Sequence, residues 1–332
     1  MNRPELIAAL SAVAPGLASQ EILEQSTCFV FKEGKVFTYN DEIAIQHELD
    51  LGFEGAVVGD KLISYLNKAA SEDADLSVEG GELRVKCGRS RAGFTLQAEI
   101  NLPLEEIGKL DELDWWDLPE DFLSGLAFVR FSVSRDMSNP KITCAHVNGA
   151  YIESTDNYRM TRYELDEDFG FENLLVPGRV MPVLSKFKPI SYATRQGWVY
   201  FENEAGSVLS CRMYAEGYPK LDPLLEVEGT EVELPDNLNK LLERASIFAD
   251  ADLEKDLEIE LKLDKGKVTV SGKGAAGWFE ETMKAKYKGE SFSFKAHPGF
   301  MGECLTISNT VVVGENALKL SGDNFQHVVS LV

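Results

Sequence analysis

The sequence has few cysteines and histidines and no long apolar run. Its five cysteines are odd in number and lie far apart in a chain of 332 residues, which is long enough to build cores without disulfides. We therefore expect reduced thiols and a cytoplasmic protein. The four histidines have no second histidine or cysteine at the spacing of a zinc site. No apolar stretch approaches the roughly 18 residues of a membrane span, so the sequence predicts no membrane-spanning segment.

Basic residues are also in short supply. Lys and Arg number 33 against 55 Asp and Glu, which gives a net charge of −22. If that charge were spread evenly it would repel phosphate, and this argues against a basic nucleic-acid-binding protein. Apolar residues make up 44% of the chain and aromatic residues 10%, so the composition supports a packed core and excludes a disordered acidic tail.

Motifs for catalysis or cofactor binding are absent or occur in the wrong context. A Gly-x-Gly-x-x-Gly pattern runs from Gly272 to Gly277, but a strand pattern follows it where a dinucleotide site needs a helix. We interpret it as a loop between strands. The acidic residues between Asp250 and Glu254 lack the glycine of a calcium loop and indicate a solvated turn. We expect no cofactor and no metal, and an acidic enzyme with a dispersed site is a further alternative.

The N-terminal segment allows two interpretations. An apolar run at residues 6–14 follows Arg3 and ends in small residues, as in a short secretory signal. However, Glu5 adjoins the run, and its apolar residues recur at helical spacing. We therefore favour a first helix of the folded protein.

Repetition is the informative feature of the chain. Alternating apolar segments joined by a tight turn, which is the signature of a β-hairpin, occur six times. The turns fall at Glu33-Gly34, Gly80-Gly81, Asn148-Gly149, Ala205-Gly206, Lys265-Gly266 and Glu315-Asn316. The first, third and fifth turns are 115 and 117 residues apart, and the others are 126 and 110 apart. These spacings predict three copies of one domain, each with two hairpins.

Segments of helical periodicity lie between the hairpins. They cover residues 3–14, 60–70, 119–133, 178–188 and 235–246, with a short, weak segment at 297–305. Such helices need a sheet to cover, so we predict an α+β protein with two helices packed on antiparallel sheet in each domain. The predicted domains are 1–110, 111–228 and 229–332.

Charge is distributed unevenly over this pattern. Lys and Arg outnumber Asp and Glu by two in the predicted helices, whereas the rest of the chain carries −24. The simpler interpretation is that exposed strands and loops hold carboxylates for solubility. The alternative is a weakly positive helical surface that faces a polyanion.

Several short segments resemble the bacterial replicative sliding clamp, the β subunit of DNA polymerase III. The run Thr155-Asp156-Asn157-Tyr158-Arg159 resembles that family's Thr-Asp-Gly-His-Arg signature. Weaker matches start at Gly88, Tyr214 and Arg244, in the same order and domain positions as in the family. The likeness covers essentially the whole chain and identifies the predicted fold as the DNA-clamp fold.

The resemblance implies a non-catalytic processivity factor. Two copies would join head to tail in a ring that encircles duplex DNA and tethers a polymerase, with helices lining the hole. Lysines and arginines on these helices would touch phosphates without reading bases. The DNA-facing residues it implies are Lys61, Lys68, Arg130, Arg135, Arg179, Lys186, Lys188, Lys240 and Arg244. The dimer contact it implies joins Ile247 and Phe248 to Phe94 and Leu96.

The resemblance also implies a pocket for short linear motifs of polymerases and clamp loaders. The matching positions are Thr155, Asn157, Tyr158, Arg159, Met160, Pro219, Leu224, Val328, Val329 and Leu331. Two features depart from the family: Asn157-Tyr158 replaces Gly-His, and the chain ends in Val-Val-Ser-Leu-Val. They indicate a divergent clamp with altered peptide specificity. A clamp-fold interaction scaffold that has lost ring closure or DNA binding is the alternative hypothesis.

Overall fold

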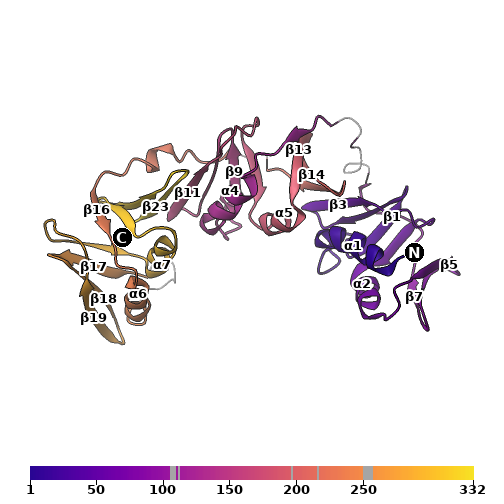
Figure 1. Cartoon of the computed structure of the whole chain (residues 1–332), viewed down its shortest axis with the longest axis horizontal. Helices are drawn as coiled ribbons and strands as arrows, with labels where there is room; N and C mark the ends of the chain where they lie inside the picture. The colour runs from indigo at the N-terminus through magenta and orange to yellow at the C-terminus, as the bar shows by residue number, and fades with distance from the viewer. Residues whose placement is uncertain (105–109, 111–112, 196, 215–216, 250–256) are drawn as a thin grey trace. The chain divides into compact units, whose positions relative to one another are not determined.

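The structure is a computed structural model that describes residues 1–104, 110, 113–195, 197–214, 217–249 and 257–332. The chain forms two compact units. Met1–Leu123 and Leu174–Glu216 make up unit 1, and Ser124–Asn173 and Gly217–Val332 make up unit 2. Figure 1 labels their helices and strands. The three predicted domains, 1–110, 111–228 and 229–332, stay a prediction.

Unit 1 contains an eight-stranded sheet in the order β4-β1-β2-β3-β15-β14-β13-β8 and a three-stranded sheet in the order β5-β6-β7. The large sheet consists of β1 (Cys28–Lys32), β2 (Lys35–Tyr39), β3 (Ile43–Glu48), β4 (Gly55–Val58), β8 (Trp116–Asp117), β13 (Pro189–Arg195), β14 (Trp198–Asn203) and β15 (Val208–Arg212). The small sheet consists of β5 (Asp75–Glu79), β6 (Glu82–Cys87) and β7 (Ser90–Thr95). The unit's remaining elements are α1 (Arg3–Val13), η1 (Ala14–Gly16), α2 (Gly59–Lys68), β12 (Leu174–Pro177) and α5 (Met181–Phe187).

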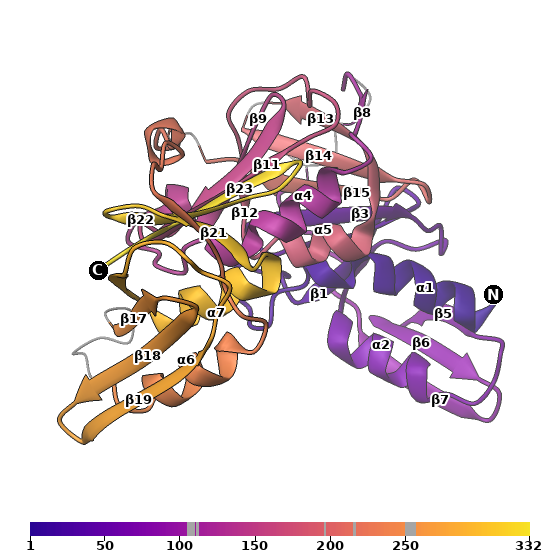
Figure 2. The ribbon, with the colours of Figure 1, turned by 60° about the vertical axis from the view of Figure 1, so that its left-hand side comes forward.

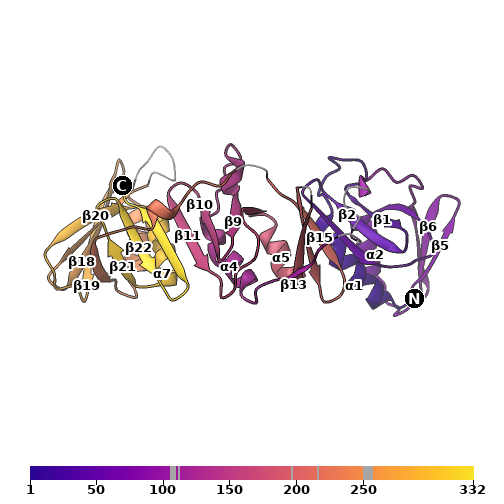
Figure 3. The same ribbon diagram turned by 90° about the horizontal axis from the view of Figure 1, so that it is seen from above.

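The large sheet of unit 1 is covered on both faces. Helix α1 buries Leu6, Leu10 and Val13 and contacts β2 and β3. A second cluster, which includes Cys28, Val30, Tyr39 and Trp198, lies on the opposite side of the strands. This explains why β1 is a continuous apolar run instead of an alternating one. In Figure 3 the strands β5 and β6 of the small sheet lie to the right of β1 and β2 of the large sheet.

In unit 2 the strands of one antiparallel sheet follow the order β9-β10-β11-β23-β22-β21-β16, and a four-stranded sheet follows the order β19-β18-β17-β20. The first set is β9 (Cys144–Asn148), β10 (Tyr151–Thr155), β11 (Arg159–Glu164), β16 (Thr230–Glu233), β21 (Thr310–Val313), β22 (Ala317–Ser321) and β23 (Phe325–Ser330). The second is β17 (Ile259–Asp264), β18 (Lys267–Gly274), β19 (Gly277–Lys284) and β20 (Phe292–Ala296). The helical elements are α4 (Phe122–Val129, which begins at the end of unit 1), η2 (Arg130–Ser132), η3 (Pro140–Thr143), η4 (Asp222–Leu224), α6 (Leu238–Ser246) and α7 (Pro298–Ile307).

Helix α6 covers the four-stranded sheet. It buries Leu238, Leu241, Leu242 and Ala245 in a core shared with β17, β18 and α7. Figure 2 shows α6 beside β18 and β19, with α7 next to it. Because the buried residues recur at helical spacing, the charged side chains of α6 lie on its opposite, exposed face.

The six predicted hairpins are confirmed. They are formed by β1–β2, β5–β6, β9–β10, β14–β15, β17–β18 and β21–β22. At the first turn Lys32 pairs with Lys35, and Glu33 and Gly34 between them have φ values of +52° and +73°. Positive φ at both central residues is the type I′ turn that matches the twist of two strands.

Each of the six predicted helical segments contains a helix, including the N-terminal one, where α1 begins at Arg3. The sixth was expected to be short and weak, and this was wrong, because α7 has ten residues. Its start is stabilised by His297, whose Nδ1 accepts the N–H groups of Gly299 and Phe300, and by Pro298 in the first turn.

The Gly-x-Gly-x-x-Gly segment is a β-hairpin. Gly272 lies within β18, Gly274 ends that strand, and Gly277 begins β19. The expectation that a strand follows is confirmed, and the expected loop is only a two-residue turn. A Cβ at position 272 would collide with the carbonyl of Ala245 in α6. Helix packing therefore explains this glycine. The acidic segment 250–254 lies outside the described residues.

Candidate functional site

The turn between β10 and β11 is built by its own side chains. Asp156 Oδ1 accepts the N–H groups of Tyr158 at 3.0 Å and Arg159 at 3.1 Å. The hydroxyl of Thr155 donates to the carbonyl of Arg159 at 2.8 Å and accepts the N–H of Asn157 at 3.1 Å. Asn157 has φ +76°, a conformation that asparagine tolerates better than most residues. The replacement of the family's glycine by Asn157 is therefore compatible with the same turn.

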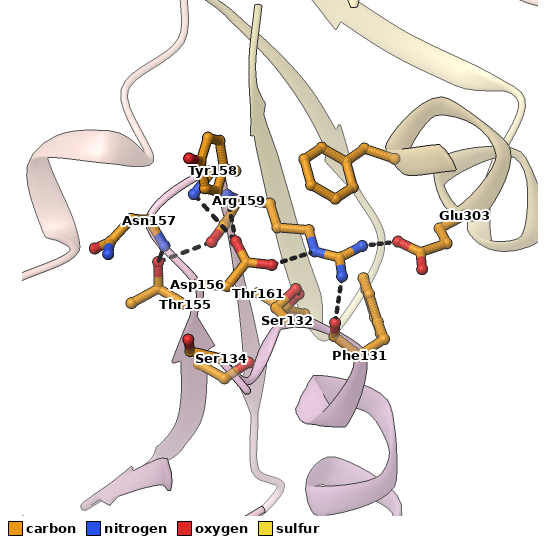
Figure 4. A network of polar contacts seen from close by, with 12 residues as sticks. Phe131, Ser132, Ser134, Thr155, Asp156, Asn157, Tyr158, Arg159, Thr161 and Glu303 are labelled. Carbon is orange, nitrogen blue, oxygen red and sulfur yellow. Dashed lines mark hydrogen bonds and ion pairs between the residues drawn. The ribbon is translucent and has the colours of Figure 1, made fainter. Parts of the chain in front are cut away.

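Arg159 joins this turn to two other segments (Figure 4). Its Nε lies 3.0 Å from Asp156 Oδ2, its Nη2 donates to the carbonyl of Phe131 at 2.6 Å, and its Nη1 forms an ion pair with Glu303. The guanidinium carbon also lies 4.5 Å from the centre of the Phe300 ring. Since the side chain is only 10% exposed, Arg159 fixes α7 and η2 against the turn.

A groove of about 1150 Å³ opens beside Arg159. It is bounded by the end of α4 and residues 130–142, by the turn at 156–159, and by the start of α7. Aromatic side chains of Phe131, Tyr158, His297 and Phe300 form much of its wall. Of the predicted pocket residues it contains Asn157, Tyr158 and Arg159. The walls from 130–142 and 297–303 were not predicted as part of a pocket.

The remaining predicted pocket residues lie elsewhere. Met160 and Val328 are buried with Leu221 and Leu225 in a small apolar cluster. Val329 is fully buried and Leu331 partly buried in the core of the four-stranded sheet and α6. Thr155 is buried, Pro219 is half-buried, and Leu224 is 50% exposed. The predicted set thus divides between the groove, the apolar cluster, the core and the connector 217–227.

A second arginine of β11 fastens that connector. Arg162 donates to Glu153 Oε2 at 2.6 and 3.0 Å and pairs with Asp222 Oδ1 at 2.8 Å. Glu153 Oε1 also lies 2.9 Å from His146 Nδ1. Burial opposes the charge on Arg162, but its hydrogen bonds and its attraction to Glu153 raise its pKa, so it stays charged.

Tyr218 completes the attachment of the connector. Its ring stacks on His146 with centroids 4.7 Å apart, and its hydroxyl accepts the N–H of Thr155 at 3.1 Å. Burial, followed by the charge of Glu153, raises the pKa of Tyr218, so the hydroxyl stays protonated. The connector that bears Pro219 and Leu224 is therefore held to the sheet at Tyr218 and Asp222.

All nine predicted DNA-facing side chains are exposed. Lys61 and Lys68 lie on α2, Arg179, Lys186 and Lys188 at or beside α5, and Lys240 and Arg244 on α6. Arg179 forms an ion pair with Glu42, and Arg244 pairs with Glu281 at 2.7 Å. Arg130 and Arg135 instead line the groove described above.

The four predicted dimer residues lie at or near sheet edges. Phe94 is in β7, an outer strand of the small sheet of unit 1, and Leu96 follows that strand. Ile247 is 71% exposed after α6, and Phe248 stacks on Phe279 of the outer strand β19 with centroids 6.3 Å apart.

The site residues carry no cluster of ligands for a metal, and the described part of the chain contains no such cluster elsewhere. Among the described helices, none is long and apolar enough to cross a bilayer.

This architecture is the DNA-clamp fold, as predicted. No protein-family model and no curated protein matches the sequence. The solved structures that it resembles include β sliding clamps. The DNA polymerase β subunit of Streptococcus pyogenes is 18% identical, with a TM-score of 0.83. The β sliding clamp of C. crescentus is 13% identical with a TM-score of 0.85, and the sliding clamp of Bartonella birtlesii is 12% identical with a TM-score of 0.84. Each comparison covers 100% of this chain and 98% of the other.

Proposed function

We propose that this chain is a sliding clamp, a non-catalytic processivity factor that encircles duplex DNA as a homodimer and tethers a replicative polymerase in the cytoplasm. The observation that carries the proposal is the fold, which matches DNA polymerase III β subunits over the whole length of the chain. The Thr-Asp-x-x-Arg turn at 155–159 supports it. In this proposal residues 1–110, 111–228 and 229–332 are the three clamp domains.

Contact with DNA depends on exposed basic residues of the helices. Lys68, Lys186, Lys188 and Lys240 form no ion pair with another described residue, so their charges are available to phosphates. Such contacts are independent of base sequence and weaken with salt. The net charge of −22 argues against tight binding by an open subunit, and a closed ring removes the need for it.

Ring closure would use two outer strands with complementary charges. Arg89 precedes strand β7 and Arg91 lies within it, both with exposed side chains, and β19 carries the exposed Glu280 beside Glu281, which pairs with Arg244. An unpaired strand edge is a template for a strand of a second copy. Phe94 and Leu96 beside one edge and Ile247 and Phe248 beside the other would supply the apolar part of this contact. Because the contact is heterologous, two copies must close it or it would extend into filaments.

Partner proteins would bind around the β10–β11 turn. The groove beside Arg159 offers half-buried aromatic surface with a polar rim, which suits short segments of polymerases and clamp loaders. The structure of the C. crescentus clamp has PEG at a putative β-motif tethering region, and that of the Bartonella birtlesii clamp has bound griselimycin. The PEG at that region supports the proposal that this fold carries a binding site for such segments.

Solution mass and retention on DNA test the proposal together. We expect a particle of twice the chain mass of 36.8 kDa, and salt-sensitive retention on circular DNA that disappears when the circle is cut. Charge reversal at Lys186 and Lys188 should weaken retention without changing the mass. A monomer that is not retained on circles would contradict the proposal and favour the interaction scaffold.

A further inference from the structure

The groove of unit 2 carries two arginines that have no carboxylate partner among the described residues. Arg130 begins η2 directly after α4, and Arg135 lies in the segment that follows. Both side chains are exposed, both line the groove of about 1150 Å³, and neither forms an ion pair with another described residue. The two arginines thus place two exposed positive charges beside one groove of a chain with a net charge of −22.

The carboxylates of the same groove are already engaged. Asp156 accepts two backbone N–H groups and holds the Nε of Arg159, while Glu303 pairs with the other end of that guanidinium. Asp136 Oδ1 accepts the N–H of Ser138 at 2.9 Å. Arg130 and Arg135 are therefore the charged donors that a ligand in the groove can reach.

The wall chemistry favours a peptide over DNA as the occupant. Phe131, Tyr158, His297 and Phe300 present aromatic surface that is half-buried, which suits apolar side chains. A duplex carries one phosphate charge per roughly 1.7 Å of its axis, so it would also meet the carboxylates of Asp136, Asp156 and Glu303. A peptide can instead place one carboxylate at the arginines and apolar side chains against the rings.

We propose that Arg130 and Arg135 bind an acidic residue of a partner's apolar segment and select segments of that composition. This rests on the proposed function and specifies the partner chemistry of its binding site. The two arginines then serve partner recognition instead of the DNA contact that the resemblance implies for them. An exposed charge contact of this kind accelerates association and weakens with salt.

Two labelled synthetic peptides test the proposal on the full chain. They share the same apolar side chains, and one carries an aspartate where the other carries an asparagine. We expect the aspartate peptide to bind about tenfold more tightly at low salt, as one carboxylate paired with two exposed arginines would allow. The double substitution Arg130→Gln and Arg135→Gln should abolish this preference and leave retention on circular DNA unchanged. The matched control, Lys186→Gln with Lys188→Gln, should weaken retention and leave the preference intact.

Three results would overturn the proposal. The peptides could bind equally well to the unaltered chain, or neither could bind. Alternatively, the Arg130 and Arg135 variant could keep the preference and lose retention on DNA, which would assign these arginines to DNA. None of these results affects the proposed clamp, because solution mass and retention of the unaltered chain on circles report on that separately.

Discussion

Arg159 and Arg162 lie three residues apart in β11, yet they organise different parts of the molecule. Side chains alternate along a strand, so the two point to opposite faces of the sheet. Arg162 pairs with Glu153, which is 2% exposed, and reaches Asp222 at its outer end. Arg159 pairs with Asp156 and Glu303, and all three line the groove. One ion-pair cluster therefore holds the interior and the connector, whereas the other shapes a surface that a ligand can reach.

Removing the buried carboxylate is expected to have the largest effect. Glu153→Gln leaves Arg162 buried without its main counter-charge, and breaking a buried pair costs about 3 kcal/mol. We expect the free energy of unfolding in urea to fall by that amount. Glu303→Gln is the matched control on the other face, where the carboxylate is 45% exposed. Similar losses in both variants would contradict the distinction between the clusters.

The Arg159 face should also show a dependence on pH. His327 is fully buried, and burial, followed by the charge of Arg159, lowers the pKa of this imidazole to about 3. Between that value and the unfolded pKa of about 6.5, the unfolded chain binds the extra proton. Stability should therefore fall as pH decreases through this window, by up to about 1.4 kcal/mol per pH unit for this one group.

Urea unfolding at several pH values measures this effect. Comparison with His327→Asn isolates the contribution of His327, because asparagine does not titrate. The variant loses stability at neutral pH but should have a shallower slope of stability against pH. Equal slopes in both proteins would show that His327 does not account for the acid sensitivity.

The smallest effects should come from the outer carboxylates. Asp222→Asn and Glu303→Gln each disturb a partly exposed ion pair, so we expect losses of about 0.5 to 1 kcal/mol in stability. Their effects on the aspartate peptide should differ. Loss of Glu303 frees one end of Arg159 and removes a negative charge from the groove, which should raise affinity about threefold. Asp222→Asn should leave the affinity for this peptide unchanged. Equal changes of affinity in the two variants would contradict the distinction between the Arg159 and Arg162 clusters.

The sequence predicted the repeated elements because hairpins and helices have local signatures. The turn at Thr155 to Arg159 was recognisable for the same reason, since five adjacent residues build it. The groove had no such signature. Its walls come from residues 130–142, 156–159 and 297–303, which are brought together by the pairing of β11 with β23, where Met160 faces Val328. No spacing along the chain indicates that pairing, so His297, Phe300 and Glu303 were missed.

The ion pairs were also beyond prediction. Helical periodicity placed the basic residues on exposed faces, and their side chains are exposed in the structure. It could not indicate that Arg179 meets Glu42 or that Arg244 meets Glu281, because these partners lie on strands or loops far away in sequence. Net charge and periodicity therefore overestimate the positive charge that helices α5 and α6 can offer.

The glycine-rich segment of β18 sets the distance between helix α6 and the four-stranded sheet. Since Gly272 lets the backbone of Ala245 rest directly on the strand, this residue sets the height of α6 above its sheet. Any side chain there would lift the helix, and Lys240 and Arg244 with it. A segment that resembles a nucleotide cradle in sequence thus acts as a spacer that fixes how far two basic side chains stand out from the protein.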